Sequence, residues 1–327
     1  MVFYIHGIGH YHPENEITNK FLEELDIGTS HDWIMERVGI TSRRTALPLD
    51  YIRETRNSDL RAANEAAEIS LAETGKLAGE MALKRAGIEP SQIGLMLAGS
   101  SASDTQTPVE AARIARELGI EAPVMDVNSA CTSFFAALHL MSMMHARKVP
   151  EYVMLVQPEA VSRTVNFNDR NSAVLWGDAT TAVVLSAKVP TRARISGCEL
   201  VSDPKGADNI VVPRAGYFSQ NGSAVQKFAI KKTLEQIQRL RKRAQSGRPL
   251  QFVGHQANLR MLENVCKLAG IATEHHHKNV DKFGNTAGSS STAVLSMRWE
   301  EWRPGDQVAV TGVGAGLSWG GYLLSFL

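Results

Sequence analysis

One helix in this sequence is apolar on almost all of its sides, and any fold must bury it. Residues 125–140 read MDVNSACTSFFAALHL, in which an apolar run gives way to a short polar turn and then to a helix from Cys131 onward. A helix at the surface would show polar residues along one face. This one carries Phe134, Phe135 and Leu138 round its circumference, so we place it in the middle of the protein.

Cys131 stands where the expected strand turns into this helix. The positive end of the helix dipole and unpaired amides would lie beneath its sulfur, which favours the thiolate, the form that attacks carbonyls. Taken alone, a cysteine in an apolar helix is more often a small core residue. The choice between the two interpretations depends on polar residues further along the chain.

Composition excludes several classes of protein. The chain has 327 residues, too many for one ordinary core, so two domains or a duplicated one are expected. It is 43% hydrophobic and 21% charged with a net charge of +1, whereas a nucleic-acid-binding protein would usually carry a strong basic excess. We therefore expect a globular protein that binds no nucleic acid.

The cysteines and the N-terminal sequence indicate a cytoplasmic protein. Cys131, Cys198 and Cys266 are odd in number and widely spaced, which predicts neither a disulfide framework nor a zinc site. The tract 275–277 is all histidine, but consecutive residues of a strand face opposite ways and cannot ligate one ion. The N-terminus does not resemble a signal peptide, and no apolar stretch is long enough to cross a bilayer.

The first part of the chain alternates between strands and helices. We expect strands at 2–9, 93–98, 124–127, 152–156 and 181–185, and helices at 31–40, 53–87 (with a turn near Thr74-Gly75), 108–118 and from Cys131. Thr107-Pro-Val-Glu has the form of a capping box that opens the helix at 108–118.

The later chain repeats this order of elements. We expect helices at 224–243 and 289–299, and strands at 251–253, 308–312 and 322–326, the last two joined by the glycine-rich run 312–321. The repeat predicts two βα-rich halves, 1–188 and 189–327, related by a pseudo-twofold axis. Cys131 and Asn285 would occupy equivalent turns, and His255 ends the strand that matches 93–98. The three side chains would converge between the halves, where small-molecule sites are usually found.

Two motifs carry a family resemblance. Residues 254–260 read GHQANLR and residues 283–289 read FGNTAGS. With the Ser-Ala-Cys turn and the glycine-rich run, they resemble the β-ketoacyl-(acyl carrier protein) synthase III family of thiolase-like condensing enzymes, over nearly the whole chain. The departures are Gly254 in place of a usual proline, Gly-Asp-Ala-Thr-Thr from Gly177 in place of a glycine-richer sequence, and an extra segment at 49–72. These departures leave Cys131, His255 and Asn285 unchanged. They affect only the details expected of substrate binding.

The resemblance implies a fold, an activity and a mechanism. The fold would be an α/β thiolase-like sandwich of five layers, αβαβα, in a homodimer. Cys131 would accept an acyl group from acyl-coenzyme A, and His255 and Asn285 would stabilise the enolate formed when a malonyl thioester on acyl carrier protein loses carbon dioxide. Asn285 rather than a second histidine indicates the initiating type, and the absence of a second cysteine from 312–321 argues against a thiolase. No metal and no cofactor beyond the substrates is expected.

Further residues receive roles from the same resemblance. They are Asn258 and Gly316 as support and oxyanion-hole residues, Trp33 and Arg163 for coenzyme A, and Lys227 and Arg260 for the carrier protein. In short-chain members a bulky aromatic residue at the position of Thr107 closes the acyl pocket across the dimer. Thr107 and the loop 100–106 offer no aromatic ring, so we expect a preference for medium or longer acyl chains. The alternative for Thr107 is a helix N-cap alone.

Three other functions remain to be weighed. A relative of the same fold could pass the acyl group to an alcohol, an amine or a second β-keto chain in secondary metabolism, and the three polar residues do not distinguish these acceptors. A non-catalytic acyl-thioester binding protein would have no use for the nucleophile. A cysteine hydrolase would have to admit water to its acyl-enzyme, which a deeply buried Cys131 helix disfavours.

Overall fold

The computed structural model describes residues 1–245 and 248–327 and contains one large mixed sheet. Its nine strands follow the order β11-β12-β13-β8-β1-β7-β6-β4-β5. They are β1 (Phe3–Tyr11), β4 (Ile93–Ala98), β5 (Val124–Asp126), β6 (Tyr152–Glu159), β7 (Ala179–Ser186), β8 (Ala193–Ser202), β11 (Gln251–Val253), β12 (Gln307–Gly314) and β13 (Ser318–Phe326). Two small sheets pair β2 (Asn15–Thr18) with β3 (Ser42–Thr45) and β9 (Ile210–Val211) with β10 (Ser219–Gln220).

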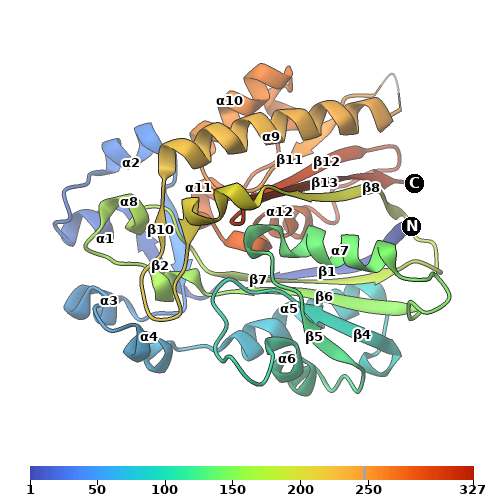
Figure 1. Ribbon diagram of the computed structural model, residues 1–327, viewed down its shortest axis with the longest axis horizontal. Helices are drawn as coiled ribbons and strands as arrows, with labels where there is room; N and C mark the ends of the chain where they lie inside the picture. Colours follow the sequence, from blue (N-terminus) through green and yellow to red (C-terminus); the bar gives the residue numbers. More distant parts are fainter. Residues whose placement is uncertain (246–247) are drawn as a thin grey trace.

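The helices fall into long ones that cover the large sheet and short ones that lie at its end (Figure 1). The long ones are α5 (Leu71–Ala86), α6 (Glu110–Leu118), α7 (Ser133–Met143), α9 (Gly222–Arg243), α10 (Leu259–Ala269) and α12 (Ser290–Met297). The short ones are α1 (Asn19–Glu24), α2 (His31–Arg37), α3 (Leu49–Thr55), α4 (Leu60–Ala66), α8 (Arg170–Ala173) and α11 (Val280–Phe283). Among the described residues, no helix is both long and apolar enough to cross a membrane.

The large sheet consists of two half-sheets with the same topology. In the first, β4 pairs in parallel with β5 and β6, and β6, β7 and β1 follow in antiparallel order. In the second, β11 pairs in parallel with β12 and bridges to His276, and β12, β13 and β8 follow in antiparallel order. A short antiparallel pairing of β1 with β8 joins them. The predicted boundary at residue 188 falls in the connection between β7 and β8.

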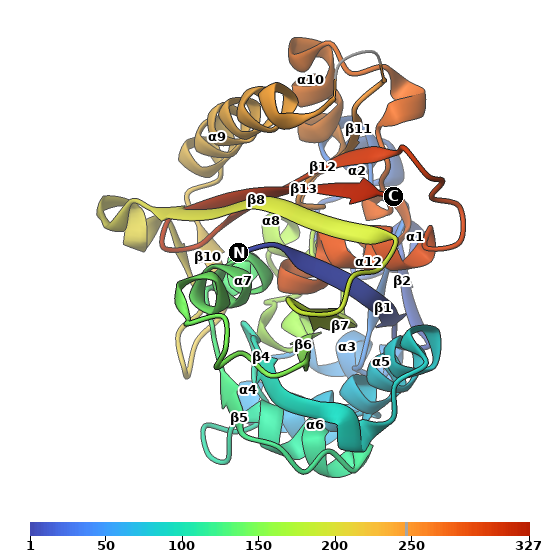
Figure 2. The same ribbon diagram turned by 90° about the vertical axis from the view of Figure 1, so that its right-hand side faces the viewer.

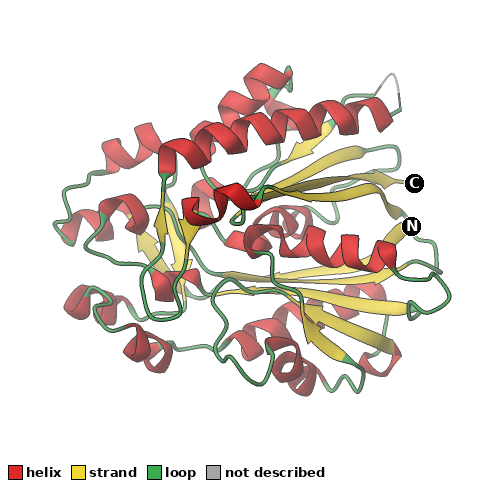
Figure 3. Ribbon diagram, in the orientation of Figure 1, coloured by secondary structure: helices red, strands yellow, loops and turns green. Residues whose placement is uncertain are grey.

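Five layers result from this duplication (Figures 1, 2 and 3). α5 and α6 cover the outer face of the first half-sheet, and α9 and α10 cover the outer side of the second. α7 and α12 lie between the half-sheets, and α7 buries Phe134, Phe135 and Leu138 in the core that both half-sheets share. The predicted thiolase-like αβαβα sandwich is confirmed.

The segment before β4 differs from the sequence prediction. Instead of one helical stretch with a turn near Thr74 and Gly75, it forms α3, α4 and α5, and Gly75 lies inside α5. A Cβ on Gly75 would come within 2.6 Å of the Ile114 side chain, so this glycine allows α5 to approach α6 closely. The prediction mistook a packing glycine for a turn glycine.

The predicted capping box before α6 is also wrong. α6 begins at Glu110, and its N-cap residue, Val109, makes no side-chain cap. The carboxylate of Asp126, at the end of β5, accepts hydrogen bonds from the amides of Glu110 and Ala111, each at 3.0 Å. The helix is therefore capped by a neighbouring strand, and Thr107 is left as an exposed loop residue.

This cap can be tested with a pair of alanine variants. Asp126→Ala should lower the free energy of unfolding by about 1–2 kcal/mol, because two first-turn amides lose a charged acceptor. Thr107→Ala should leave it unchanged within error. Urea unfolding at one protein concentration measures both free energies. A larger loss of unfolding free energy in Thr107→Ala than in Asp126→Ala would support Thr107 as the cap and contradict this interpretation.

Candidate active site

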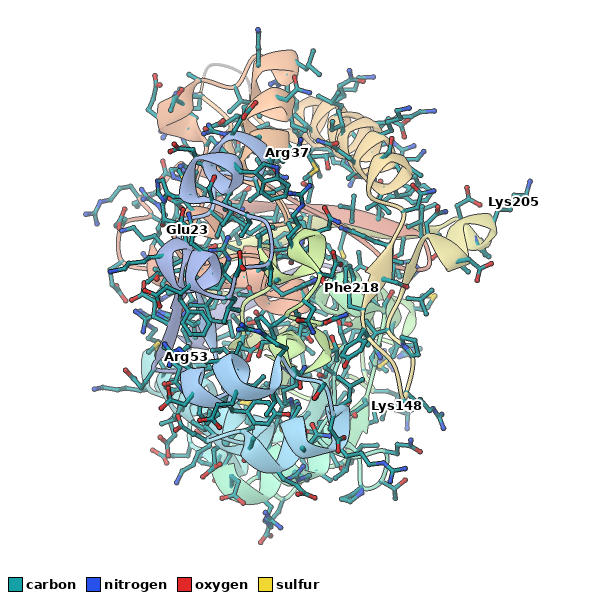
Figure 4. The ribbon with its side chains drawn as sticks, turned by 90° about the vertical axis from the view of Figure 1, so that its left-hand side faces the viewer. Glu23, Arg37, Arg53, Lys148, Lys205 and Phe218 are labelled. Carbon is teal, nitrogen blue, oxygen red and sulfur yellow. The ribbon has the colours of Figure 1, made fainter. Side chains whose placement is uncertain are left out.

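A cavity of about 590 Å³ brings the three predicted polar residues together. Cys131, His255 and Asn285 all line it, and Trp33 and Arg37 of α2 line it as well. Much of the remaining wall is apolar and comes from Leu175, Trp176, Ile210, Phe218, Val225, Phe228, Val313 and Leu317. Figure 4 looks onto the face of the molecule that carries Arg37 and Phe218.

Cys131 lies in a turn between β5 and α7 that is held by several side-chain hydrogen bonds. We call this turn the first elbow (residues 128–133). The Asn128 Oδ1 accepts a hydrogen bond from the amide of Ala130 at 2.8 Å, and Ala130 has a φ of 48°, in the left-handed region. Ser133 Oγ accepts from the amide of Ser129 and donates to the Ala130 carbonyl. The elbow is therefore held by its own side chains before any substrate binds.

The end of β12 lies directly against this elbow. A Cβ on Gly314 would be 3.2 Å from the Cys131 amide nitrogen, so a larger residue would crowd the elbow. Gly316, which the sequence analysis expected at the oxyanion hole, does not line the cavity. Gly314 does line it, and its backbone lies beside Cys131.

The elbow occurs a second time, before α12. Residues 285–290, the second elbow, read NTAGSS, where the first reads NSACTS. Ala287 has a φ of 46°, and its amide donates to Asn285 Oδ1 at 3.0 Å. The two turns thus match residue by residue, with Asn285 equivalent to Asn128 and Gly288 equivalent to Cys131. The sequence analysis had paired Cys131 with Asn285, three positions out of register.

His255 follows β11 and is held as a neutral hydrogen-bond donor. Its Nδ1 lies 2.7 Å from Ser290 Oγ, and the same oxygen accepts from the Gln256 amide at 3.2 Å. We assign the ring proton to Nε2, with the Ser290 hydroxyl donating to Nδ1. Burial lowers the pKa of His255 to about 4, so the ring stays neutral at neutral pH.

Asn285 is fixed by its backbone as well as its side chain. Its amide donates to the Leu175 carbonyl at 2.8 Å, and its carbonyl accepts from the Gly177 amide at 3.0 Å. Because Oδ1 is bound to the Ala287 amide, the NH₂ end of the side chain is the part that remains to bind a ligand in the cavity. His255 and Asn285 thus offer two neutral N–H donors beside one thiol.

The Cys131 thiol is protonated at neutral pH. Burial raises the pKa of Cys131 to about 12, the charge of Glu159 adds to the rise, and only the residue's own amide opposes it. The expectation that the helix N-terminus lowers this pKa is therefore wrong for the free protein. Loss of the thiol proton must accompany attack on the substrate.

Comparison with known proteins decides the family. Models of 3-oxoacyl-[acyl-carrier-protein (ACP)] synthase III and of its C-terminal part match residues 125–204 and 250–326, and a β-ketoacyl synthase N-terminal model matches 59–150. The chain is 31% identical to β-ketoacyl-[acyl-carrier-protein] synthase III of Syntrophomonas wolfei, over 97% of this chain and 96% of that protein. This chain belongs to the β-ketoacyl-[acyl-carrier-protein] synthase III family. The resemblance stated from the sequence is confirmed.

Solved structures agree with the assignment. The synthase III of Aquifex aeolicus superposes with a TM-score of 0.87 at 25% identity, over 99% of this chain and 100% of that one. That of Pseudomonas aeruginosa gives 0.82 at 28% identity, over 100% and 98%. OleA of Xanthomonas campestris, at 20% identity and a TM-score of 0.84 over 99% and 96%, shares the fold.

Trp33, which lines the cavity, contacts two cations. The guanidinium groups of Arg37 and Arg170 each lie 4.9 Å from the centroid of its ring. Arg163, the arginine predicted for coenzyme A, is instead buried in an ion pair with Asp104 at 2.7 Å and does not line the cavity. Of the two arginines in the segment after β6, Arg170 contacts Trp33, and Arg163 pairs with Asp104 instead.

Arg170 reaches Trp33 through a contact between distant parts of the chain. Asp169 precedes it and caps α8 by accepting from the Asn171 amide, so Arg170 is the first residue of that short helix. Arg170 also donates to the Gly28 carbonyl, across a gap of more than a hundred residues in the chain. That long-range contact brings it to Trp33, and no local pattern predicts it.

The remaining predicted residues lie on the outside or rim of the site. Asn258 lines the cavity, but its side chain caps α10 through the Met261 amide and donates to the Arg37 carbonyl. Its support is therefore to the helices and not to the reacting atoms. Lys227 on α9 is exposed, and so is Arg260 on α10, which binds the Met35 carbonyl and Glu263.

Thr107 contributes nothing to the wall of the cavity. Thr107 is exposed in its loop and lines no part of the cavity. Within residues 1–245 and 248–327, no group of three or more histidine, cysteine or acidic side chains could hold a metal ion.

Proposed function

We propose that this protein condenses an acyl-coenzyme A with a malonyl thioester through an acyl-Cys131 intermediate and releases carbon dioxide. The observation that carries the proposal is the meeting of Cys131, His255 and Asn285 on one cavity, with both donors neutral. A hydrolase would instead need a base with a free lone pair facing the cavity, and the tautomer assigned to His255 presents an N–H at Nε2. The product would be a β-ketoacyl thioester for fatty acid synthesis.

In the first step, Cys131 takes the acyl group. The Cys131 sulfur attacks the thioester carbonyl, the bond to the coenzyme A sulfur breaks, and the proton lost from Cys131 ends on the leaving thiol. Thioester exchange is nearly isoenergetic, so the acyl group stays activated. The Cys131 amide and the backbone of the loop at Gly314, which lie together, would stabilise the negative oxygen of the intermediate.

In the second step, the malonyl thioester loses carbon dioxide and becomes an enolate. Its negative oxygen would accept hydrogen bonds from His255 Nε2 and Asn285 Nδ2, and because both donors are neutral they bind most strongly as the charge develops. The enolate carbon then attacks the acyl carbon, and the bond to the Cys131 sulfur breaks. The released thiolate takes up a proton, which restores the resting enzyme.

The surroundings of the cavity suggest how the substrates bind. Trp33, Arg37 and Arg170 together offer an aromatic face and two cations, which suit the adenine and phosphates of coenzyme A. Exposed Lys227 and Arg260 lie on α9 and α10 and would meet the acidic carrier protein. The homodimer and the cytoplasmic location are proposed from the family.

The two half-reactions can be separated by substitution. Cys131→Ala should form no acyl-enzyme in intact-mass spectra. His255→Ala and Asn285→Ala should still be acylated but should decarboxylate malonyl thioester about a hundredfold more slowly, because the enolate loses one donor. The matched control is His277→Ala, which removes another buried neutral histidine outside the cavity. Normal release of carbon dioxide by both cavity variants would refute the assigned roles.

We also propose a preference for medium or longer acyl chains, around eight carbons or beyond. Each methylene that a slot can bury adds about 0.8 kcal/mol, and Thr107 is too small to close a slot across a dimer. kcat/KM should therefore rise from acetyl- to octanoyl-coenzyme A, and Thr107→Phe should reverse the order. Wild-type preference for acetyl, or a phenylalanine variant that accepts long chains equally well, would rule this out.

A further inference from the structure

The second elbow binds a buried carboxyl group that the steps above do not use. Glu159, the last residue of β6, is only 1% exposed. Its Oε1 accepts hydrogen bonds from the Gly288 amide at 3.0 Å and from Ser101 Oγ at 3.2 Å, and its Oε2 accepts from the Ser101 amide at 2.8 Å. Three donors thus converge on one acid between the half-sheets.

The duplication explains why the acid lies there. β6 and β12 are equivalent strands of eight residues each, so Glu159 and Gly314 occupy the same final position. Gly314 lies against the amide of Cys131 in the first elbow, and Glu159 binds the amide of Gly288 in the second. At the first elbow the strand ends in Gly314, which would leave space for an oxygen of the substrate. At the second elbow the strand ends in Glu159, and its own carboxyl oxygen binds the amide.

We propose that Glu159 is a positioning residue, whose carboxyl group takes at the second elbow the place that the substrate oxygen takes at the first. Gly288 lies between Asn285, which carries one enolate donor, and Ser290, which orients the other through His255 Nδ1. A hydrogen bond to the Gly288 amide therefore fixes the turn on which both donors depend. The inference rests on the proposed function, since it assigns Glu159 to the decarboxylation step.

Two features agree with a role for the carboxyl group beyond filling space. Burial raises the pKa of Glu159 to about 8, while the amides of Ser101 and Gly288 oppose the rise because they bind the charged form. Cys131 is coupled to the same charge, although no hydrogen bond to Glu159 is formed by its thiol in the described part of the chain. The acid thus acts on the second elbow by direct contact and on the first only at a distance.

Two independent variants remove the contact. Glu159→Gln keeps the shape but turns an NH₂ group toward one of the donors. Gly288→Ala keeps the acid and displaces it, since a Cβ at this position would lie 2.9 Å from Glu159 Oε1 and 3.3 Å from its next neighbours, the Ala130 carbonyl and Gln157 Oε1. Shortening the acid makes room for that methyl group, so Gly288→Ala combined with Glu159→Asp is the rescue. Glu110→Gln, which removes another fully buried acid from α6, is the control.

Both half-reactions are measured for each protein, by intact mass for acylation of Cys131 and by release of labelled carbon dioxide for decarboxylation. Glu159→Gln and Gly288→Ala should acylate within about threefold of wild type and decarboxylate about tenfold more slowly or worse, and the double variant should recover most of the loss. Glu110→Gln should change neither rate.

Three results would overturn the inference: normal decarboxylation in Gly288→Ala, an equal fall of both half-reactions, or no recovery in the double variant. Any of these leaves the proposed function standing. A wild-type protein that acylates but releases no carbon dioxide would refute the proposed function and this inference with it.

Discussion

The burial of α7 and α12 between the two half-sheets is the constraint on which the site depends. Each helix has layers on both sides, so its first turn starts inside the protein and its backbone amides cannot be satisfied by bulk water. In the two elbows, short polar side chains accept hydrogen bonds from these backbone amides. Asn128 and Asn285 accept from the amide two residues ahead, and both turns pass through a left-handed alanine. The cavity opens where the two elbows lie next to each other.

The duplication also explains how the chemistry is divided. The first elbow exposes an amide and a nucleophile to the cavity, and the second turns an asparagine side chain and a serine-bound histidine toward the same space. Because the second elbow carries glycine where the first carries Cys131, it has no nucleophile of its own. Two copies of one structural unit thus supply the acyl carrier and the enolate donors of one proposed reaction.

Much of this could be predicted from the sequence where the signal is local. The strands Ile93–Ala98 and Gln251–Val253 were predicted to the residue, and the apolar circumference of α7 correctly placed it between layers. The motifs around His255 and Asn285 led to the right family. The repeat of element order anticipated the two half-sheets, because order is preserved even where most side chains have changed.

What the sequence could not predict depends on contacts between distant segments. Arg170 reaches Trp33 from a separate helix, whereas the family resemblance pointed to Arg163. Asp126 caps α6 from the next strand, whereas the local pattern favoured Thr107. The pKa of Cys131 depends on burial and on Glu159, neither of which a helix-dipole argument contains. The register of the two elbows, with Asn285 equivalent to Asn128, follows from the hydrogen bond that each asparagine accepts from the amide two residues ahead.

The central claim, that Cys131 carries an acyl group which only a decarboxylated malonyl thioester removes efficiently, can be tested in one measurement. Wild-type protein is incubated with octanoyl-coenzyme A, freed of excess substrate, chased with malonyl-acyl carrier protein, and followed by intact and peptide mass spectrometry. The account predicts a single octanoyl adduct on the Cys131 peptide that persists in buffer and disappears on the chase, as a β-ketoacyl carrier protein forms. An adduct elsewhere, or one that water removes as fast as the chase does, would contradict it.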